Sequence, residues 1–318
     1  MGNTTGIKSL TIQRFRGIAE GSLEDLVDVN VLVGRNNSGK STVLEAIHLL
    51  STWMVPNRPP DPLGRTCADV WASTRSEASY PNENLWYRGN SDQPICLGAF
   101  VRDVRVEAVY SRGGHVATTP KPPAAPVLEF LSRVSVFRPK DLEHRGAEEK
   151  NWSTVLRTRG DRQLVVRLNE IFDLGAEQYQ LLPGGALMVL FPKEGVLLDL
   201  QGDGVRLAFR CLLTVASLQQ TVLMLEEPEC FLHPGALRRY AKALCGWARD
   251  QAVQLILTTH SLECVRYFLD AAEAAKAQGA VFHLSRSDGR LSVKRIEAAD
   301  FRALEAAETD VRFLDQYS

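Results

Sequence analysis

The residues best suited to chemistry in this sequence form a glycine-bounded loop, Gly34-Arg-Asn-Asn-Ser-Gly-Lys-Ser41, which matches the pattern G-x-x-x-x-G-K-[ST]. The loop follows segment 27–33, a predicted strand whose end is uniformly apolar, and precedes the helix-forming segment 42–50. Backbone N–H groups of such a loop hold phosphates at a helix N-terminus, where the dipole favours anions. Lys40 would bring positive charge to the β and γ phosphates, and the Ser41 hydroxyl would be a ligand of Mg²⁺. The predicted nucleotide-binding residues are Gly34, Asn36, Asn37, Ser38, Gly39, Lys40, Ser41 and Thr42.

Two carboxylates follow the fully apolar segment 221–225, namely Glu226 and Glu227. The segment is typical of a central parallel strand, and open α/β sheets bind ligands beyond the carboxyl ends of such strands. Consecutive strand residues point to opposite faces, so the two acids need not share a role. One can contribute to the Mg²⁺ site while the other polarises the attacking water.

A histidine ends the next apolar strand, in Thr258-Thr259-His260-Ser261. At the carboxyl end of a neighbouring strand, its imidazole could sense a γ-phosphate. A lone histidine at such a place often has only a structural role. Its position after the phosphate loop and the acid pair favours function.

The three motifs GRNNSGKST, LEEPECFLHP and TTHS, in this order, resemble the ABC-type ATPases of the SMC/RecF branch. They most resemble the ATPase domain of the OLD family (overcoming lysogenization defect), as does the opening segment 9–17. The resemblance implies ATP and Mg²⁺ as ligands. It also implies that Glu226 is the metal-side acid, Glu227 the catalytic base and His260 the switch histidine. Many ABC-type enzymes have Asp at the position of Glu226.

The resemblance further implies a signature loop that contacts ATP bound to the opposite subunit. Its equivalent is Leu200-Gln-Gly-Asp-Gly-Val-Arg206, with Asp203 and Gly204 as nucleotide-binding residues. The segment departs from the L-S-G-G-Q wording of transporters, because Asp203 stands where a hydroxyl or glycine is common. A turn in which Asp203 caps the following helix is the alternative.

The surrounding pattern alternates strands and helices, which favours an α/β fold. We expect a P-loop NTPase of ABC-ATPase type, with a mostly parallel sheet, antiparallel edge strands and a loop-rich or helical insertion. One domain over 1–318, with an internal insertion at 52–185, is the expected organisation. OLD proteins also carry a TOPRIM nuclease domain, for which the 58 residues after His260 are too few.

The predicted insertion holds two ambiguous groups of residues. Its aromatic residues could stack on nucleic-acid bases, but scattered aromatics more often fix an irregular segment to the core. They are Trp53, Trp71, Trp86 and Tyr87. Segment 138–167 holds eight basic and five acidic residues, which favours a solvated face over a phosphate-binding stripe.

Composition excludes several other classes of protein. The chain has 318 residues, 45% of them hydrophobic, and a formal net charge of −1, so no global basicity indicates nucleic acid. No apolar run is long enough for a transmembrane helix, and no membrane contact is expected. The six cysteines never form a C-x-x-C pair and are expected as reduced thiols in a cytoplasmic protein.

These patterns predict an ATP-hydrolysing switch for DNA-related bacterial defence or repair. ATP binding would produce a head-to-tail homodimer that works with a separate effector protein, such as a nuclease, and with DNA as a further partner. Two alternatives stay open, a nucleotide-gated scaffold with little turnover and the nucleotide-binding subunit of a transporter.

Overall fold

The computed structural model describes residues 6–55, 57–58, 60, 83–121, 123–139, 141 and 148–316. Its described strands form one large sheet of order β6-β5-β4-β1-β2-β14-β13-β3-β12-β11-β7 and a small sheet of order β10-β9-β8. The strands of the large sheet are β1 (Ile7–Phe15), β2 (Ile18–Leu23), β3 (Val29–Val33), β4 (Ile95–Val101), β5 (Val104–Tyr110), β6 (Val116–Thr119), β7 (Ser135–Phe137), β11 (Val222–Glu226), β12 (Gln254–Thr258), β13 (Gly279–Ser287) and β14 (Arg290–Glu297).

The centre of the large sheet is parallel, in the order β13-β3-β12-β11-β7. Register pairs Thr258 with both Leu32 and Glu226, and Leu225 with Phe137. The carboxyl ends of these strands therefore meet at one edge. The strands β6, β5, β4, β1 and β2 continue the sheet as an antiparallel wing. The expected α/β fold with a parallel centre is confirmed. Among the described residues, its antiparallel part has five strands, β6, β5, β4, β1 and β2, and is therefore larger than the edge strands that the sequence predicted.

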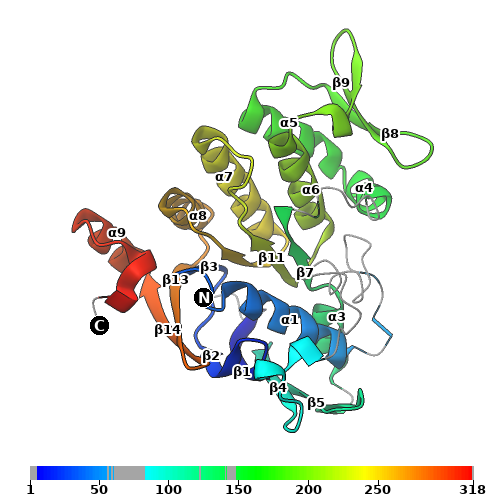
Figure 1. The fold of residues 1–318 in the computed structure, drawn as a ribbon. Helices are drawn as coiled ribbons and strands as arrows, with labels where there is room; N and C mark the ends of the chain where they lie inside the picture. The colour runs from blue at the N-terminus through cyan, green and yellow to red at the C-terminus, as the bar shows by residue number, and fades with distance from the viewer. Residues whose placement is uncertain are drawn as a thin grey trace.

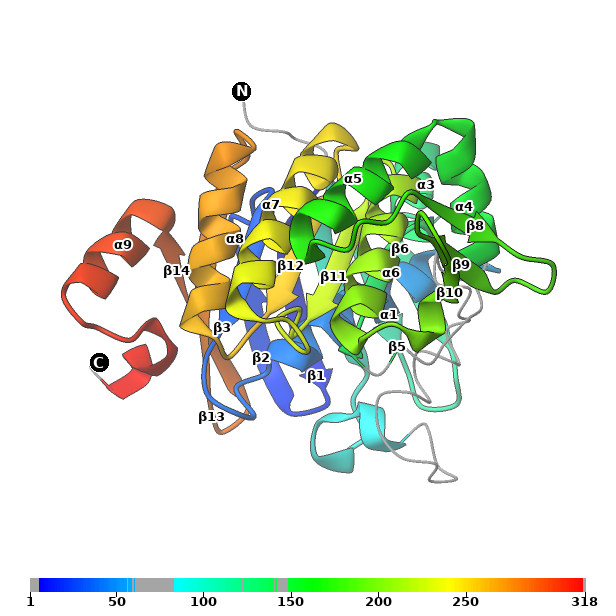
Figure 2. The same ribbon diagram turned by 90° about the horizontal axis from the view of Figure 1, so that it is seen from above.

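Helices cover both faces of the large sheet (Figures 1 and 2). The helices α4 to α8 lie over one face, and α1 and α3 over the other. Their bounds are α1 (Lys40–Met54), α3 (Ala125–Ser132), α4 (Glu148–Arg157), α5 (Gly160–Phe172), α6 (Asp203–Ser217), α7 (Pro234–Asp250), α8 (Leu262–Ala274) and α9 (Ala298–Ala306). Among the described residues, no helix has the length and apolar character required to cross a membrane.

Both faces of β3 are buried, which explains why four of its five residues are Val or Leu; the fifth, Asn30, is also buried. Val29, Val31 and Val33 point into the core under α5 to α8, whereas Leu32 points into the core beneath α1 and α3. The same division operates in β11, where Leu223 joins the first core. Strand alternation thus builds two cores, one on each side of the sheet, and fixes both flanking helix layers.

Segment 52–185 contributes to several parts of the fold. Strands β4, β5 and β7 extend the large sheet, while α4 and α5 join the helix layer. The small sheet, β8 (Gln178–Leu181), β9 (Leu187–Leu190) and β10 (Gly195–Leu197), projects beyond α5 and α6 (Figure 1). A separate insertion with these boundaries remains a prediction.

The aromatic residues of this segment pack inward where the structure describes them. The Trp53 ring stacks on Tyr110 with centroids 4.9 Å apart, and Trp86 lies 5.2 Å from the same ring. The hydroxyl of Tyr87 donates to the Asp288 carbonyl at 3.2 Å. These contacts favour the anchoring interpretation. Trp71 lies outside the described residues.

Candidate nucleotide-binding site

The glycine loop connects β3 to α1, as its motif requires. Gly34 has φ +138° and Gly39 has φ +103°, which are values that favour glycine. A Cβ on Gly34 would lie 2.2 Å from the Leu284 carbonyl oxygen on β13. The hydroxyl oxygen of Ser38 is buried and has no hydrogen-bond partner among the described residues. The loop therefore has a fixed backbone and one unsatisfied polar atom.

Lys40 is the first residue of α1 and is almost fully buried. Its ammonium donates to the carbonyls of Gly34 at 2.9 Å and Arg35 at 3.0 Å. Burial lowers the pKa of Lys40, while the nearby carboxylates of Glu227 and Glu226 act in the opposite direction. The side chain is thus folded over its own loop, where a phosphate would be an alternative partner for its charge.

Ser41 and Glu226 meet at the same sheet edge. The Ser41 hydroxyl donates to Glu226 Oε1 across 185 positions of sequence. Glu226 Oε2 lies 3.2 Å from the Nε of Arg138, whose side chain is only 3% exposed. The sequence favoured a solvated face for segment 138–167, and for the buried Arg138 this interpretation is wrong. Its position directly after the short apolar strand β7 was the available signal.

Glu227 lies just beyond β11 and has φ +47°, an uncommon conformation for a residue other than glycine. Its N–H donates to the Thr258 carbonyl at 2.9 Å, which ties it to β12. Its Oε1 is 4.0 Å from the Nε2 of His260, and its Oε2 accepts from the Cys230 thiol at 3.7 Å. Unusual backbone geometry at a candidate catalytic acid is typical of functional sites.

The His260 imidazole is 42% exposed and faces Glu227. Burial and the charge of Lys40 lower the pKa of His260 below its usual value, so the ring is neutral at pH 7. A neutral imidazole has one N–H donor and one acceptor nitrogen. It can therefore hold a water or a phosphate oxygen beside the Glu227 carboxylate.

A third acid, Glu229, also belongs to this site and was not singled out in the sequence. Its Oε1 accepts from the Thr259 hydroxyl at 2.5 Å and from the His260 N–H at 3.2 Å. Its Oε2 is buried without a hydrogen-bond partner among the described residues. Glu229 thus joins the segment after β11 to the end of β12. Its spacing from Glu226 gives no hint of this contact.

The segment resembling a signature loop lies at the start of α6. Gly202 is the N-cap and Asp203 is the first helical residue, with its carboxylate 2.7 Å from Arg206. A Cβ on Gly204 would lie 2.5 Å from the Phe231 carbonyl oxygen. The turn therefore packs on the loop after β11. Within the described part of the chain, the Asp203 carboxylate pairs with Arg206 and not with the phosphate loop.

The structure thus brings together Lys40, Ser41, Glu226, Glu227 and His260, and leaves the Asp203 turn as a separate surface. The first group combines backbone donors, a lysine, a hydroxyl and carboxylates. This is the donor set that phosphoryl transfer requires. Among the described residues, no group of three His, Cys, Asp or Glu side chains forms a cluster able to hold a metal.

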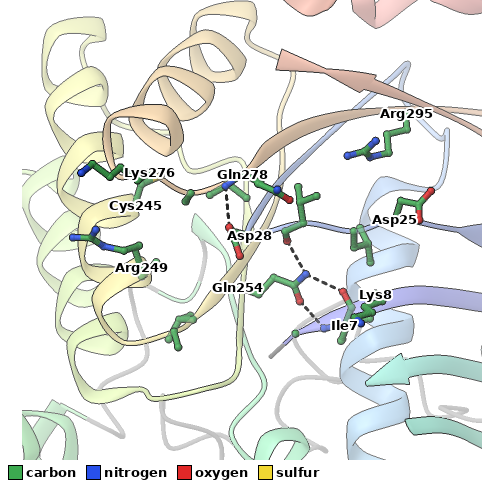
Figure 3. A pocket seen from close by; sticks show the side chains of 18 residues that line it. Ile7, Lys8, Asp25, Asp28, Cys245, Arg249, Gln254, Lys276, Gln278 and Arg295 are labelled. Carbon is green, nitrogen blue, oxygen red and sulfur yellow. Dashed lines mark hydrogen bonds between the residues drawn. The ribbon is translucent and has the colours of Figure 1, made fainter. Parts of the chain in front are cut away.

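A cavity of about 860 Å³ lies at the opposite edge of the sheet (Figure 3). It is lined by the starts of β1, β3 and β12, with Arg249, Lys276 and Arg295 around it. Gln254 uses its side chain to accept from Ile7 N–H and donate to the Ile7 carbonyl, both at 2.9 Å. The polar groups at its floor therefore connect strands. The cavity contains none of the nucleotide motifs.

Two segments of the chain match protein-family models. Residues 6–60 match "AAA ATPase domain", and residues 186–266 match "AAA domain, putative AbiEii toxin, Type IV TA system". Two proteins of Methanocaldococcus jannaschii are similar. "Uncharacterized protein MJECL11" is 29% identical over 97 residues, covering 30% of this chain and 84% of that protein. "Uncharacterized protein MJECL10" is 46% identical over 43 residues, covering 14% of this chain and 20% of that protein.

Solved structures of SMC heads have a similar fold. The SMC head domain from Thermotoga maritima aligns with TM-score 0.57 and 14% identity, covering 92% of this chain and all of that chain. An SmcHead bound to the C-winged helix domain of ScpA aligns with TM-score 0.63 and 12% sequence identity. The alignment covers 92% of this chain and 99% of that chain. The Pyrococcus furiosus Smc head bound to the C-terminal domain of ScpA aligns with TM-score 0.55 and 13% sequence identity. The alignment covers 95% of this chain and 98% of that chain.

The fold is therefore that of an SMC head, an ABC-type P-loop ATPase fold. The two segments that match AAA ATPase models contain the phosphate loop and the acid and histidine motifs.

Proposed function

We propose that this chain is a Mg²⁺-dependent ATPase of the OLD-like type that dimerises head to tail around ATP. It acts as a switch in DNA-related defence or repair, together with a separate effector protein. The observation that carries the catalytic part is the contact of Ser41 with Glu226 beside Lys40, Glu227 and His260. Segments far apart in sequence supply one phosphoryl-transfer site.

The residues present fit a Mg²⁺–ATP complex. The Ser41 hydroxyl and a Glu226 carboxylate oxygen are adjacent hard oxygen donors of the kind that Mg²⁺ prefers. The buried Ser38 hydroxyl and the Lys40 ammonium offer donors to phosphate oxygens. When bound, Mg²⁺ would neutralise phosphate charge.

Each residue then has a distinct task. Lys40 leaves the loop carbonyls and places its charge on the phosphates. Glu227 accepts a hydrogen bond from the attacking water and orients it in line with the γ-phosphate. His260 would contact the γ-phosphate through its imidazole. Catalysis in this arrangement rests on positioning and electrostatics.

Exposed apolar residues support the dimer part of the proposal. Leu200, directly before the Asp203 turn, is 74% exposed, and Phe231, in the loop after β11, is 56% exposed. Gly204 packs on the Phe231 backbone and lies four positions after Leu200. Large apolar side chains exposed on a surface are typical of a protein interface. A second copy, bringing its own phosphate loop, would cover them.

The dimer is tested with the Glu227→Gln protein, which should hold Mg²⁺–ATP without hydrolysing it. Light scattering after gel filtration should report a monomer without nucleotide and a dimer with ATP. Adding Leu200→Asp should abolish the dimer, because it places a charge in an apolar contact. The matched control is Val166→Asp, at a 55% exposed position on α5. A dimer that survives Leu200→Asp, or one that Val166→Asp removes equally, would contradict this interface.

The DNA and effector parts rest on resemblance. The motif order resembles the SMC/RecF branch, and two of the similar SMC heads are in complex with ScpA domains. A head of this fold thus can present a surface to a partner protein. Affinity purification of the tagged chain from its own cells, with and without Lys40→Ala, tests this. Nucleotide-dependent recovery of an effector or of DNA would support the assignment.

A further inference from the structure

The last described segment of the chain returns to the nucleotide site. The turn η5 (Val311–Gln316) follows α9 and packs against β13. Val311 is 1% exposed and Leu314 is 8% exposed, and both join the core under α5 to α8. The turn is therefore anchored by apolar burial. The side chains beside these anchors, Arg312 and Asp315, are held in place.

Arg312 donates from Nη1 to the carbonyl oxygen of His260 at 2.8 Å. The rest of its guanidinium is fixed by Asp310, which accepts from Nε at 2.9 Å and from Nη2 at 2.6 Å. A planar guanidinium held on one carboxylate has its remaining donors in a defined direction. The contact with His260 is thus preorganised by Asp310.

The other side of the His260 backbone is also held. Its N–H donates to Glu229, which in turn accepts from Thr259. Both polar backbone groups of His260 therefore have fixed partners, one from the segment after β11 and one from η5. Only the side-chain torsions remain free to turn the imidazole toward or away from Glu227.

The same turn also faces the phosphate loop. Asp315 Oδ2 lies 3.7 Å from a guanidinium nitrogen of Arg35, and Asp315 Oδ1 lies 3.7 Å from the Nε2 of His283. The Arg35 carbonyl is one of the acceptors of Lys40. Arg35 is 56% exposed, so this ion pair is weak by itself. The ion pair matters for position and not for stability, because it shows that η5 contacts the phosphate loop as well as the His260 loop.

We propose that Arg312 is a positioning residue for ATP hydrolysis, which holds the His260 backbone so that the imidazole stays beside Glu227. The proposal rests on the proposed function, since it assigns a role within that reaction. Within the described part of the chain, the Arg312 guanidinium bonds to Asp310 and to the His260 carbonyl, so it acts on the site through His260. Asp310 supports the same role by fixing the guanidinium.

The kinetic test compares Arg312→Ala and Arg312→Lys with the wild type. Misplacing a group in a phosphoryl-transfer site by a fraction of an ångström lowers the rate more than the affinity. Arg312→Ala should lower kcat roughly ten- to a hundred-fold with little change in KM. Arg312→Lys keeps a charged donor without the two-pronged contact to Asp310, so its kcat should be intermediate. The matched control is Arg302→Ala, which removes an arginine bound to Asp270 on the nearby helices.

A second measurement does not require activity. The charged groups that influence the pKa of the His260 imidazole are Lys40, Glu227, Glu229 and Arg312. Loss of the Arg312 charge should raise the pKa of the imidazole in an NMR titration of the histidine ring protons. The His260 signal is identified by its loss in His260→Gln. Arg302→Ala should leave this pKa unchanged.

The two measurements separate the possible failures. A wild type that binds but does not hydrolyse ATP would refute the proposed function. The NMR titration would then still test whether Arg312 lies close to His260. An active wild type whose kcat is unchanged in folded Arg312→Ala would overturn the positioning role. An equal loss in Arg302→Ala would also overturn it, because the effect would then reflect stability alone.

Discussion

Replacing Glu226 by Gln should destabilise the protein, whereas the same change at Glu227 should not. Glu226 lies 3.2 Å from the Nε of Arg138, and the Arg138 side chain is 3% exposed. A gross attraction of about 5 kcal/mol follows at an effective dielectric constant of about 20. Desolvation offsets most of it, and Glu226 is itself 23% exposed.

In Glu226→Gln the amide oxygen can still accept from Arg138 while the amide NH2 donates to the Ser41 hydroxyl, so both contacts can be kept and the charge is lost. Charged hydrogen bonds contribute more to stability than neutral ones by roughly 1–2 kcal/mol. In a chain of this size, such a loss lowers Tm by roughly 1.5–3 °C. Glu227 is 45% exposed and faces a neutral imidazole at 4.0 Å. Its replacement should change stability by less than about 0.5 kcal/mol.

Thermal unfolding without nucleotide, followed by circular dichroism, measures this difference. The same two proteins are then compared in ATP turnover. Glu227→Gln should retain Mg²⁺–ATP and lose turnover, while Glu226→Gln should require more Mg²⁺ for half-maximal binding. The reasoning would be refuted if Glu226→Gln melted like the wild type while Glu227→Gln melted early. Trapping of ATP by Glu226→Gln and loss of ATP by Glu227→Gln would reverse their roles.

Two further predictions concern the phosphate loop and His283, a buried histidine of β13 that pairs in register with Val33 of β3. Gly34→Ala should weaken ATP binding more than about ten-fold, because its Cβ would lie 2.2 Å from the Leu284 carbonyl oxygen. Calorimetry measures the affinity for ATP. The control is Gly246→Ala, whose Cβ would make only ordinary contacts. Burial lowers the pKa of His283 below 6.5, so its neutral form stabilises the fold above that pH, and this stability is lost as pH falls further. Tm should therefore fall less steeply below pH 6.5 in His283→Gln than in the wild type, and identical slopes would disprove the assignment.

The parts of the site that were predictable from the sequence are those carried by local patterns. A glycine loop between an apolar strand and a helix, and acids directly after an apolar strand, both describe single segments. Parallel strands meet at one edge, so the grouping of Lys40, Glu226 and His260 also followed from strand order. In the fold, the charges of Glu227 and Glu226 act to raise the pKa of Lys40, against the effect of burial.

The supporting residues were not predictable, because their contacts depend on register and packing between distant segments. Arg138 reaches Glu226 only because β7 pairs with β11. Arg312 reaches His260 across 52 positions, through a turn whose place depends on the packing of α9 and β13. Neither residue stands in a motif.

Some local elements were missed for simpler reasons. The proline-rich segment 120–126 contains a helix start, because α3 begins at Ala125 with Pro126 in its first turn. A proline is tolerated there, since that N–H has no helical partner. Strand β10 ends at Leu197, and a short 3₁₀ turn follows it although the sequence stays apolar at Leu198 and Leu200. Helix α9 has a short, weakly patterned sequence and depends on its packing.

The central claim is that this chain hydrolyses ATP at the site formed by the phosphate loop and the end of β11. The most direct measurement is steady-state phosphate release by the purified protein with Mg²⁺–ATP, beside Lys40→Ala. The Lys40 ammonium donates to carbonyls of its own loop, so its variant should fold normally. We predict turnover by the wild type that saturates with ATP and is absent in folded Lys40→Ala. Equal phosphate release by both proteins, or none by a wild type that binds Mg²⁺–ATP, would contradict the claim.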